Sequence, residues 1–324
     1  MDALLTAAFT KAYPGFELAF DLSLAPGITA LMGPSGSGKT TAIRCLAGLV
    51  RPETGLVRWG EECWQDSAQG SFLSVQQRRI GFVFKEFALF PHMTVWENVR
   101  YGAKRDAWAK ELLELLAIDA LRDRRPPQLS AGQQQRVAIA RAIASEPRLL
   151  LMDEPFSSLD PPLKRHLLAE FASLVRRIGL PTLVVTHALD EASVLADDLV
   201  VMAAGRVLQK APVREVMTTP SSPEVARLVG IRNCFEASAD VAAWCVRADR
   251  IVLANPADEG AIRLMVKEAV LEEGGLRILG TGGVFEALEV RLPLSACEGR
   301  AIGPGASLDL RIPPEAVHRF EGMR

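Results

Sequence analysis

The fold of this chain is decided by the stretch "GITALMGPSGSGKTTAIRCLAGL", residues 27–49. Its first six residues form a short apolar run, which is typical of a buried strand. Residues 33–40, "GPSGSGKT", match the pattern G-x-x-x-x-G-K-[ST], and the residues after them are compatible with a helix. A strand, a glycine-rich loop and a helix in this order predict a phosphate-binding loop in an α/β domain.

The residue types of this loop suit the binding of ATP. Glycines let the backbone curl until its N–H groups point at phosphate oxygens, and the helix that follows adds the positive end of its dipole. Lys39 can reach the β- and γ-phosphates, and Thr40 can offer its hydroxyl to Mg²⁺. The alternative is a flexible glycine turn with a solvated lysine. We predict that ATP contacts Gly33, Pro34, Ser35, Gly36, Ser37, Gly38, Lys39, Thr40 and Thr41.

A second stretch, "RLLLMDEP" at residues 148–155, is an apolar strand that ends in two carboxylates. Asp153 is placed to hold Mg²⁺ through a water molecule, as the strand-end acid of a P-loop enzyme does. Glu154 stands next to it, where it can polarise an attacking water as a general base. Two acids at a strand end are usually only a solvated edge, but their position after a phosphate-binding loop favours a catalytic pair.

Composition limits the class of protein. The chain has 324 residues, of which 49% are hydrophobic and 23% charged, as in an ordinary globular protein with room for two domains. A net charge of −2 gives no reason to expect a nucleic-acid partner. No apolar run approaches the ~20 residues of a membrane span, and the N-terminus lacks the pattern of a signal peptide. Five cysteines without a C-x-x-C pair fit a reducing compartment, so we expect a cytosolic chain.

The periodicity of the sequence predicts two domains. Residues 1–230 alternate strand-like and helix-like segments, which predicts an α/β domain with a mostly parallel sheet. Within it, a helical subdomain is expected at about residues 86–146, where Thr94 and Glu97 form a capping box. After the turn-rich "TTPSSPE" the pattern changes to strict alternation, with Leu308 and Leu310 on one face. Residues 231–324 are therefore predicted to form a small, barrel-like all-β domain.

A third stretch, "LSAGQQQRVAIARA" at residues 129–142, carries a family resemblance. With the phosphate-binding loop, "LLLMDEP", "SSLD" at residues 157–160 and "TH" at residues 186–187, it resembles the ATP-binding subunits of ABC transporters. In that family two copies sandwich two ATP molecules. The resemblance implies a homodimer in which the signature residues of one copy contact the ATP of the other, with Mg²⁺ bound beside it. These residues are Ser130, Ala131, Gly132 and Gln133.

Further roles follow from the resemblance. His187 resembles the switch histidine that contacts the γ-phosphate, and Asp160 the loop aspartate at the dimer interface. Tyr13 lies roughly where the family places an aromatic ring against adenine. Ala131 replaces the usual glycine, a small change that should spare the contacts of its neighbours. The simpler interpretation of Ser130 is a helix cap, because "SAGQ" is also an ordinary capping box.

Lys85 is a second position at which the chain departs from the family. In "RRIGFVFKEFALFPHMTVWENV", residues 78–99, the family normally has glutamine where this chain has Lys85. A lysine has three donors and no acceptor, so it cannot ligate Mg²⁺, but it can contact the γ-phosphate. Three outcomes stay open: hydrolysis persists, hydrolysis is slowed or made substrate-dependent, or the lysine points to solvent. We expect retained activity, with Glu154, His187 and Lys85 as the catalytic candidates.

The helical insert and the β domain, the latter similar to the TOBE or mop type, resemble bacterial importers of small solutes. The phrases "LFPHMTVWENVRYG" and "IRNCFEA" most resemble the ATPases of molybdate or tungstate importers, although sulfate, ferric-iron, polyamine and sugar importers share most of them. The resemblance implies an ATP-hydrolysing, energy-coupling subunit, peripheral on the cytoplasmic face of the membrane. It also implies two permease subunits and an extracytoplasmic solute-binding protein. The alternatives are a soluble ABC ATPase acting on nucleic acid or ribosomes, and a solute-sensing role for the β domain.

Overall fold

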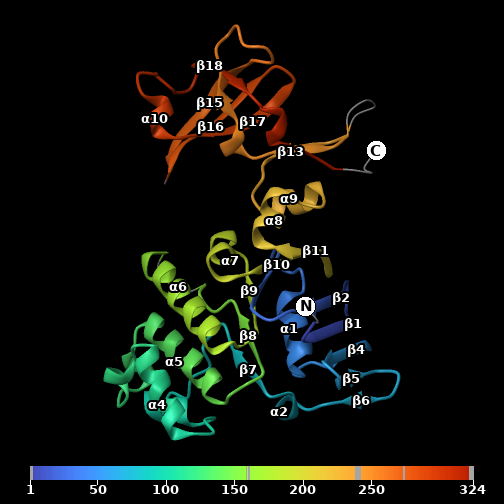
Figure 1. Cartoon of the computed structure of the whole chain (residues 1–324), viewed down its shortest axis with the longest axis vertical. Coiled ribbons are helices and arrows are strands. Elements are labelled where there is room, and N and C mark those ends of the chain that lie inside the picture. The colour runs from blue at the N-terminus through green and yellow to red at the C-terminus, as the bar shows by residue number, and fades with distance from the viewer. Residues whose placement is uncertain (1–2, 158, 160, 238–241, 273, 321–324) are drawn as a thin grey trace. The chain divides into compact units, whose positions relative to one another are not determined.

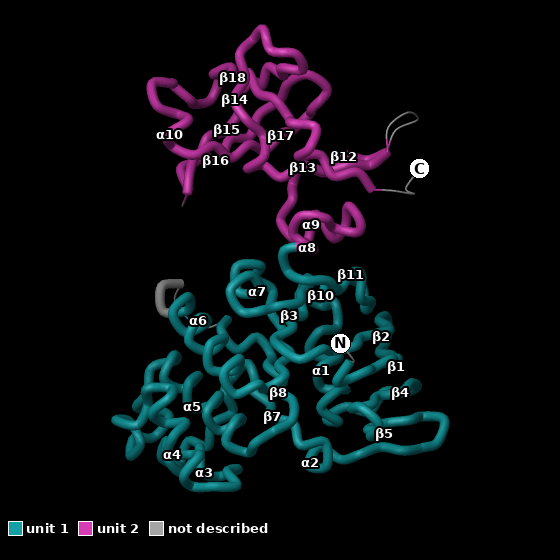
Figure 2. Tube along the Cα trace, viewed as in Figure 1, with its two compact units in different colours: residues 1–214 teal, residues 215–324 magenta. Residues whose placement is uncertain are grey.

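The computed structural model describes residues 3–157, 159, 161–237, 242–272 and 274–320. The chain divides into two compact units, Met1–Arg214 and Glu215–Arg324, which Figure 2 shows in different colours. Each unit has its own sheets and its own hydrophobic core. The units are therefore described separately.

Most strands of the described residues belong to unit 1. They are β1 (Leu5–Tyr13), β2 (Phe16–Leu24), β3 (Ile28–Met32), β4 (Thr54–Trp59), β5 (Glu62–Asp66), β6 (Ser71–Phe72), β7 (Ile80–Val83), β8 (Leu149–Asp153), β9 (Thr182–Thr186), β10 (Asp198–Ala203) and β11 (Arg206–Pro212). Within the described residues they form one sheet, in the order β6-β5-β4-β1-β2-β11-β10-β3-β9-β8-β7 (Figure 1). The α/β class predicted from the sequence is confirmed.

The sheet is mixed, not mostly parallel as predicted. Strands β10, β3, β9, β8 and β7 pair in parallel with one another, and β11 pairs in parallel with β2. Strands β6, β5, β4, β1 and β2 pair antiparallel with one another, and β10 pairs antiparallel with β11. The reason is the connection between β1 and β2, which consists only of Pro14 and Gly15, with φ +77° at the glycine. A two-residue turn can join antiparallel strands only, because a parallel connection needs a long crossover.

The central strands are covered on both faces. In β8, Leu150 and Met152 pack into one hydrophobic cluster, and Leu149 and Leu151 pack into another on the opposite side. All five residues of β8 are buried. A strand buried on both faces reads as a continuous apolar run, which is why "LLLM" could be recognised in the sequence.

The helices of unit 1 surround this sheet. They are α1 (Lys39–Ala47), α2 (Val75–Arg78), α3 (Val95–Arg100), α4 (Asp106–Leu115), α5 (Ala131–Ala144), α6 (Pro161–Ile178) and α7 (Leu189–Leu195). Helices α3, α4 and α5 lie within residues 86–146, and the assignment of these residues as an inserted subdomain stays a prediction. The capping box is confirmed: the backbone N–H of Thr94 donates to Oε2 of Glu97 at 2.7 Å, and the N–H of Glu97 donates to Oγ1 of Thr94 at 3.2 Å. In the part of the chain that the structure describes, no helix is both long and apolar enough to cross a bilayer.

Arg78 holds the end of helix α1 from inside the core. Its side chain is fully buried, and its guanidinium donates to the carbonyl oxygens of Cys45 (2.9 Å) and Leu46 (2.7 Å) in the last turn of α1. A third donor bonds the carbonyl oxygen of Leu73 at 3.1 Å. Burial lowers the pKa of Arg78 to about 10, so it stays charged at neutral pH. Arg78 therefore supplies a donor to the carbonyl of Leu46 and a second donor to that of Cys45, which also accepts from the N–H of Gly48 at 3.0 Å.

We expect Arg78→Met to lower the free energy of unfolding by about 3 kcal/mol, because it removes several buried hydrogen bonds to backbone carbonyls. Urea unfolding followed by tryptophan fluorescence measures this, since Trp59 and Trp64 stack in the same region with ring centroids 5.6 Å apart. Arg79→Met is the matched control, because the adjacent Arg79 is exposed. Its expected change is within about 0.5 kcal/mol. Equal losses in the two variants would contradict the role given to Arg78.

Unit 2 is built mainly from two small antiparallel sheets. Its strands are β12 (Asn233–Phe235), β13 (Trp244–Val246), β14 (Val252–Leu253), β15 (Ile262–Glu272), β16 (Gly275–Gly282), β17 (Phe285–Leu292), β18 (Ser307–Arg311) and β19 (Val317–Arg319). In the described residues the sheet orders are β12-β13-β19 and β14-β18-β15-β16-β17. Leu308 and Leu310 of β18 are buried, which confirms the predicted alternation and the small all-β region.

Short helices accompany these sheets. They are α8 (Val213–Thr218), α9 (Pro223–Leu228) and α10 (Leu294–Cys297). The division of the chain after Arg214 falls within α8, so α9 is grouped with the second unit. The boundary expected after residue 230 lies beyond both helices, and the assignment of residues 1–230 and 231–324 as functional domains stays a prediction.

Candidate functional site

The predicted site residues of unit 1 follow four strands that are neighbours in the sheet. The strands lie in the order β3, β9, β8, β7, and all of them are parallel. Parallel strands end at the same edge, and in open α/β sheets ligands bind at the carboxyl ends of the strands. The glycine-rich loop follows β3, His187 follows β9, Asp153 and Glu154 lie at the end of β8, and Lys85 follows β7.

The backbone of the loop has the shape that glycines permit. A Cβ atom on Gly33 would lie 2.1 Å from the carbonyl oxygen of Met202 in β10, so no side chain fits there. Gly36 and Gly38 have left-handed φ angles of +81° and +98°. Gly38 caps helix α1 without a side chain, which leaves the first amides of α1 free to bind an anion.

Lys39 lies inside this loop. Its side chain is buried, and Nζ donates to the carbonyl oxygens of Gly33 and Pro34, both at 2.8 Å. Burial lowers the pKa of Lys39, while the negative charges of Glu154 and Asp153 oppose this shift. The hydroxyl of Ser37 is also buried and has no hydrogen-bond partner among the described residues. A buried ammonium, an unpaired hydroxyl and open amides together fit the phosphates of an anionic substrate.

Thr40 and Asp153 offer oxygen atoms of the kind that Mg²⁺ prefers. Oγ1 of Thr40 donates to Oδ1 of Asp153 at 2.9 Å, across the space between α1 and β8. Burial raises the pKa of Asp153, and the hydrogen bond from Thr40 opposes the rise. A hydroxyl beside a carboxylate fits a magnesium ion that also has phosphate ligands.

Glu154 is held in an unusual backbone conformation. Its φ is +46°, in the left-handed region that residues other than glycine rarely occupy. Its N–H donates to the carbonyl oxygen of Val185 in β9 at 3.1 Å, and its own carbonyl accepts from Oγ of Ser157 at 2.9 Å. Such strained residues occur preferentially at functional sites, where the surrounding structure fixes them.

The carboxylate of Glu154 has two positively charged or chargeable neighbours. Its Oε2 atom lies 2.7 Å from Nζ of Lys85 and 3.7 Å from Nδ1 of His187. Burial raises the pKa of Glu154, but the hydrogen bond and charge of Lys85 and the charges of His187 and Lys39 outweigh it, and the net pKa is lowered. The same hydrogen bond raises the pKa of Lys85.

This ion pair was not anticipated from the sequence. The sequence suggested that Lys85 contacts the γ-phosphate or points to solvent, but in the structure it binds the proposed general base. The contact depends on β7 lying next to β8, and these strands are separated by the whole helical subdomain. The sequence would have suggested the ion pair only if the pairing of β7 with β8 had been known.

Other predicted residues lie away from this edge. Ser130 caps helix α5, and its hydrogen bonds are with Gln133: the N–H of Ser130 donates to Oε1 at 3.0 Å, and Oγ accepts from the N–H at 3.3 Å. Ala131 is exposed and Gly132 buried. Figure 1 shows α5 apart from α1, the helix that follows the phosphate-binding loop.

The remaining predicted residues are less informative. Thr41 lies in the first turn of α1. Tyr13 ends β1 and is 44% exposed. The ring of Phe16 lies against the loop, 3.0 Å from where a Cβ of Gly38 would be. Asp160 lies outside the described residues. The roles given to these residues stay predictions.

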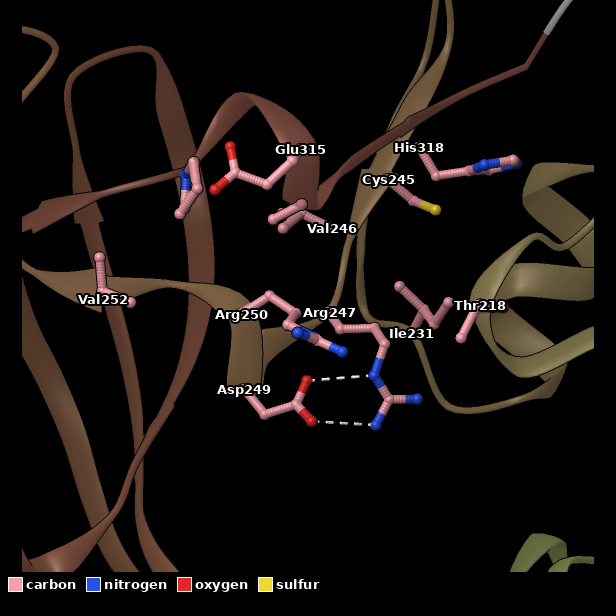
Figure 3. A pocket seen from close by; sticks show the side chains of 12 residues that line it. Thr218, Ile231, Cys245, Val246, Arg247, Asp249, Arg250, Val252, Glu315 and His318 are labelled. Carbon is pink, nitrogen blue, oxygen red and sulfur yellow. Dashed lines mark hydrogen bonds and ion pairs between the residues drawn. The ribbon is translucent and has the colours of Figure 1, made fainter. Parts of the chain in front are cut away.

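Unit 2 contains a separate cavity of about 400 Å³, shown in Figure 3. Nε and Nη2 of Arg247 donate to the two carboxylate oxygens of Asp249, both at 3.1 Å. Nε2 of His318 is 2.8 Å from the carbonyl oxygen of Pro220. The charged groups of Arg247 and Asp249, which line this cavity, are therefore already paired with each other.

Known proteins resemble the chain over much of its length. The family described as "ABC transporter" matches residues 19–157. The molybdenum import ATP-binding protein ModC of Pseudomonas syringae is 47% identical over 218 residues, which cover 65% of this chain and 60% of the relative. The sulfate/thiosulfate import ATP-binding protein CysA of Xylella fastidiosa is 42% identical over 284 residues, which cover 80% of this chain and 78% of the relative.

A solved structure agrees with the fold. A nucleotide-free ATP-binding cassette from an ABC transporter has 25% sequence identity and a TM-score of 0.61, and the match covers 70% of this chain and 98% of that one. The chain therefore belongs to the ABC transporter family, and its unit 1 has the fold of an ATP-binding cassette. Its curated relatives are ATP-binding proteins of molybdenum and of sulfate import. The chain spans 60% of the length of the Pseudomonas relative that it matches.

Proposed function

We propose that this chain is the ATP-hydrolysing, energy-coupling subunit of an ABC importer for molybdate or a related oxyanion. The observation that carries the proposal is the convergence of Lys39, Thr40, Asp153, Glu154 and His187 at the carboxyl ends of three neighbouring parallel strands. The similarity to molybdenum import ATP-binding proteins supports the choice of solute.

The phosphates of ATP are bound by the amides of residues 33–40 and by Lys39. When the nucleotide enters, the Lys39 ammonium exchanges the carbonyls of Gly33 and Pro34 for the β- and γ-phosphates. Because Lys39 is buried, its charge acts on the phosphates with little screening by water. Tyr13 is proposed to lie against the adenine ring.

Thr40 would hold Mg²⁺ directly and Asp153 through a water molecule. When bound, the ion neutralises the charge of the phosphate oxygens. Glu154 accepts a proton from the water that attacks the γ-phosphate, and its fixed backbone aims the carboxylate. His187, whose Nδ1 is 3.7 Å from that carboxylate, donates to the γ-phosphate.

The signature residues act on a second copy of the chain. In a homodimer, Ser130 and Gly132 contact the γ-phosphate that the partner copy holds, and Asp160 lies at the interface. Residues at the N-terminus of α5 suit this contact, because amides at a helix start favour an anion. ATP closes the dimer and hydrolysis reopens it, which shifts two permease subunits between states. The chain then works at the cytoplasmic face of the membrane, and a solute-binding protein delivers the oxyanion outside.

The proposal predicts ATP-dependent uptake of molybdate by vesicles that contain the chain and the permease that co-purifies with it. We expect uptake to stop without ATP, to fall with excess tungstate and to change little with equal sulfate. Radioactive molybdate retained in the vesicles is the measurement. The matched control is a vesicle that holds the permease without this chain.

A sulfate importer is the second candidate, because the similarity to the sulfate/thiosulfate relative extends over 284 residues, compared with 218 for the molybdenum relative. Uptake of sulfate that equal molybdate fails to reduce would reject the choice of molybdate and favour this alternative. If the vesicles took up neither molybdate nor sulfate, both choices of solute would be rejected.

A further inference from the structure

We propose that Lys85 is a positioning residue that holds the Glu154 carboxylate in an ion pair and restrains hydrolysis until residues 84–90 shift. This inference rests on the proposed role of Glu154 as the general base. In this inference Lys85 slows hydrolysis, whereas a lysine that contacts the γ-phosphate would speed it.

The first support is the identity of the atom that Lys85 binds. Nζ of Lys85 is 2.7 Å from Oε2 of Glu154, the distance of a charge-assisted hydrogen bond. A general base needs a free lone pair within hydrogen-bond reach of the attacking water. The Lys85 ammonium that donates to Oε2 occupies one of these lone pairs. Because an ammonium has no acceptor, it cannot take the proton of the attacking water in place of Glu154.

The second support is the side from which Lys85 approaches. Its side chain is 58% exposed, whereas that of Glu154 is only 18% exposed. Lys85 therefore reaches the carboxylate from its more exposed side. Movement of Lys85 would break this contact while the backbone of Glu154 stays held by its hydrogen bond to Val185.

The third support is the strained turn that carries Lys85. Two and three positions after it, Phe87 and Ala88 have φ angles of +61° and +48°, two successive left-handed residues that are not glycine. Such residues persist only where the surroundings hold them. Arg141 of helix α5 supplies that hold: its guanidinium donates to the carbonyl oxygen of Ala88 at 2.8 Å and to that of Phe87 at 3.1 Å.

The far end of the turn is fixed as well. The buried side chain of Asn98 in α3 accepts from the N–H of Phe90 at 2.9 Å and donates to the carbonyl oxygens of Phe90 and Met93 at 3.1 and 3.2 Å. The turn thus lies between two helices of the helical subdomain. Since α5 begins next to Ser130, movement of α5 against the sheet pulls on the turn that holds Lys85.

Steady-state kinetics of Lys85→Met and Lys85→Arg in the full chain test this inference. Lys85→Met keeps the length of the side chain and removes its charge, so we expect kcat for ATP to rise about 5-fold, the size that a half-exposed ion pair supports. KM should stay within about twofold, since Lys85 binds the base and not the nucleotide. Lys85→Arg retains the ion pair and should resemble the wild type.

A second variant tests the role of the turn. Arg141→Lys keeps the charge but loses the planar fork that binds two carbonyls at once, so it should loosen the turn. We expect kcat to rise less in Arg141→Lys than in Lys85→Met. Adding Arg141→Lys to Lys85→Met should cause no further rise, because Arg141 acts through Lys85. Hydrogen exchange provides a readout besides activity: the amides of residues 84–90 should exchange faster in both single variants than in the wild type.

The outcomes separate this inference from the proposed function. If the wild type hydrolyses ATP and Lys85→Met is equal to it or slower, the restraint is overturned while the ATPase proposal stands. Unchanged hydrogen exchange at residues 84–90 in Lys85→Met would also overturn it. If no form hydrolyses ATP although ATP binds, the proposed function fails, and the restraint fails with it.

Discussion

Glu154→Gln should lower the rate of ATP hydrolysis at least about 100-fold, the usual contribution of a general base. Glutamine has nearly the same shape as glutamate, but its amide cannot take a proton from water. The substitution keeps the backbone hydrogen bond of residue 154 to Val185 and leaves the residues of the glycine-rich loop unchanged, so the affinity for ATP should change little. Steady-state turnover and a separate titration with ATP measure the two effects.

The matched control is Glu146→Gln. Glu146 pairs with Arg105 on the surface of the helical subdomain, with its Oε1 atom 2.8 Å from Nε, and takes no part in the strand-end site. The Glu146→Gln variant should hydrolyse ATP at the rate of the wild type. If Glu154→Gln retained most of its turnover, another group would have to activate the water.

Lys39→Met should weaken the binding of ATP by about 10- to 100-fold, the range expected for losing a charge-assisted hydrogen bond to a phosphate. The substitution removes the buried ammonium that now binds the carbonyls of Gly33 and Pro34. The fold should survive, because methionine fills the same space without a charge to desolvate. Calorimetric titration with Mg²⁺-ATP measures the dissociation constant.

Lys104→Met is the control for this variant, because Lys104 is exposed in the helical subdomain. Its dissociation constant for ATP should equal that of the wild type. Equal affinity in Lys39→Met and the wild type would mean that the glycine-rich loop does not bind the phosphates, and the proposed function would lose its basis.

The sequence was most informative where a strand is buried on both faces. The apolar runs at residues 27–32, 148–152 and 182–186 correspond to β3, β8 and β9. Local hydrogen bonds were also predictable, as with the capping box of Thr94 and Glu97. In such cases the residues that decide the structure are close together in the chain.

Contacts between distant segments could not be predicted in this way. Lys85 meets Glu154 only because β7 pairs with β8, and no local pattern specifies which strands become neighbours. The buried position of Arg78 depends in the same way on the end of α1. The left-handed backbone of Glu154 gives no signal, because glutamate rarely adopts it.

The central claim is that the strand-end site hydrolyses ATP, and its most direct test is ATP turnover of the purified full chain, with and without Mg²⁺. The account predicts turnover that requires Mg²⁺, disappears in Glu154→Gln and increases in Lys85→Met. A chain that binds ATP but shows no Mg²⁺-dependent turnover, alone or with its permease, would contradict it.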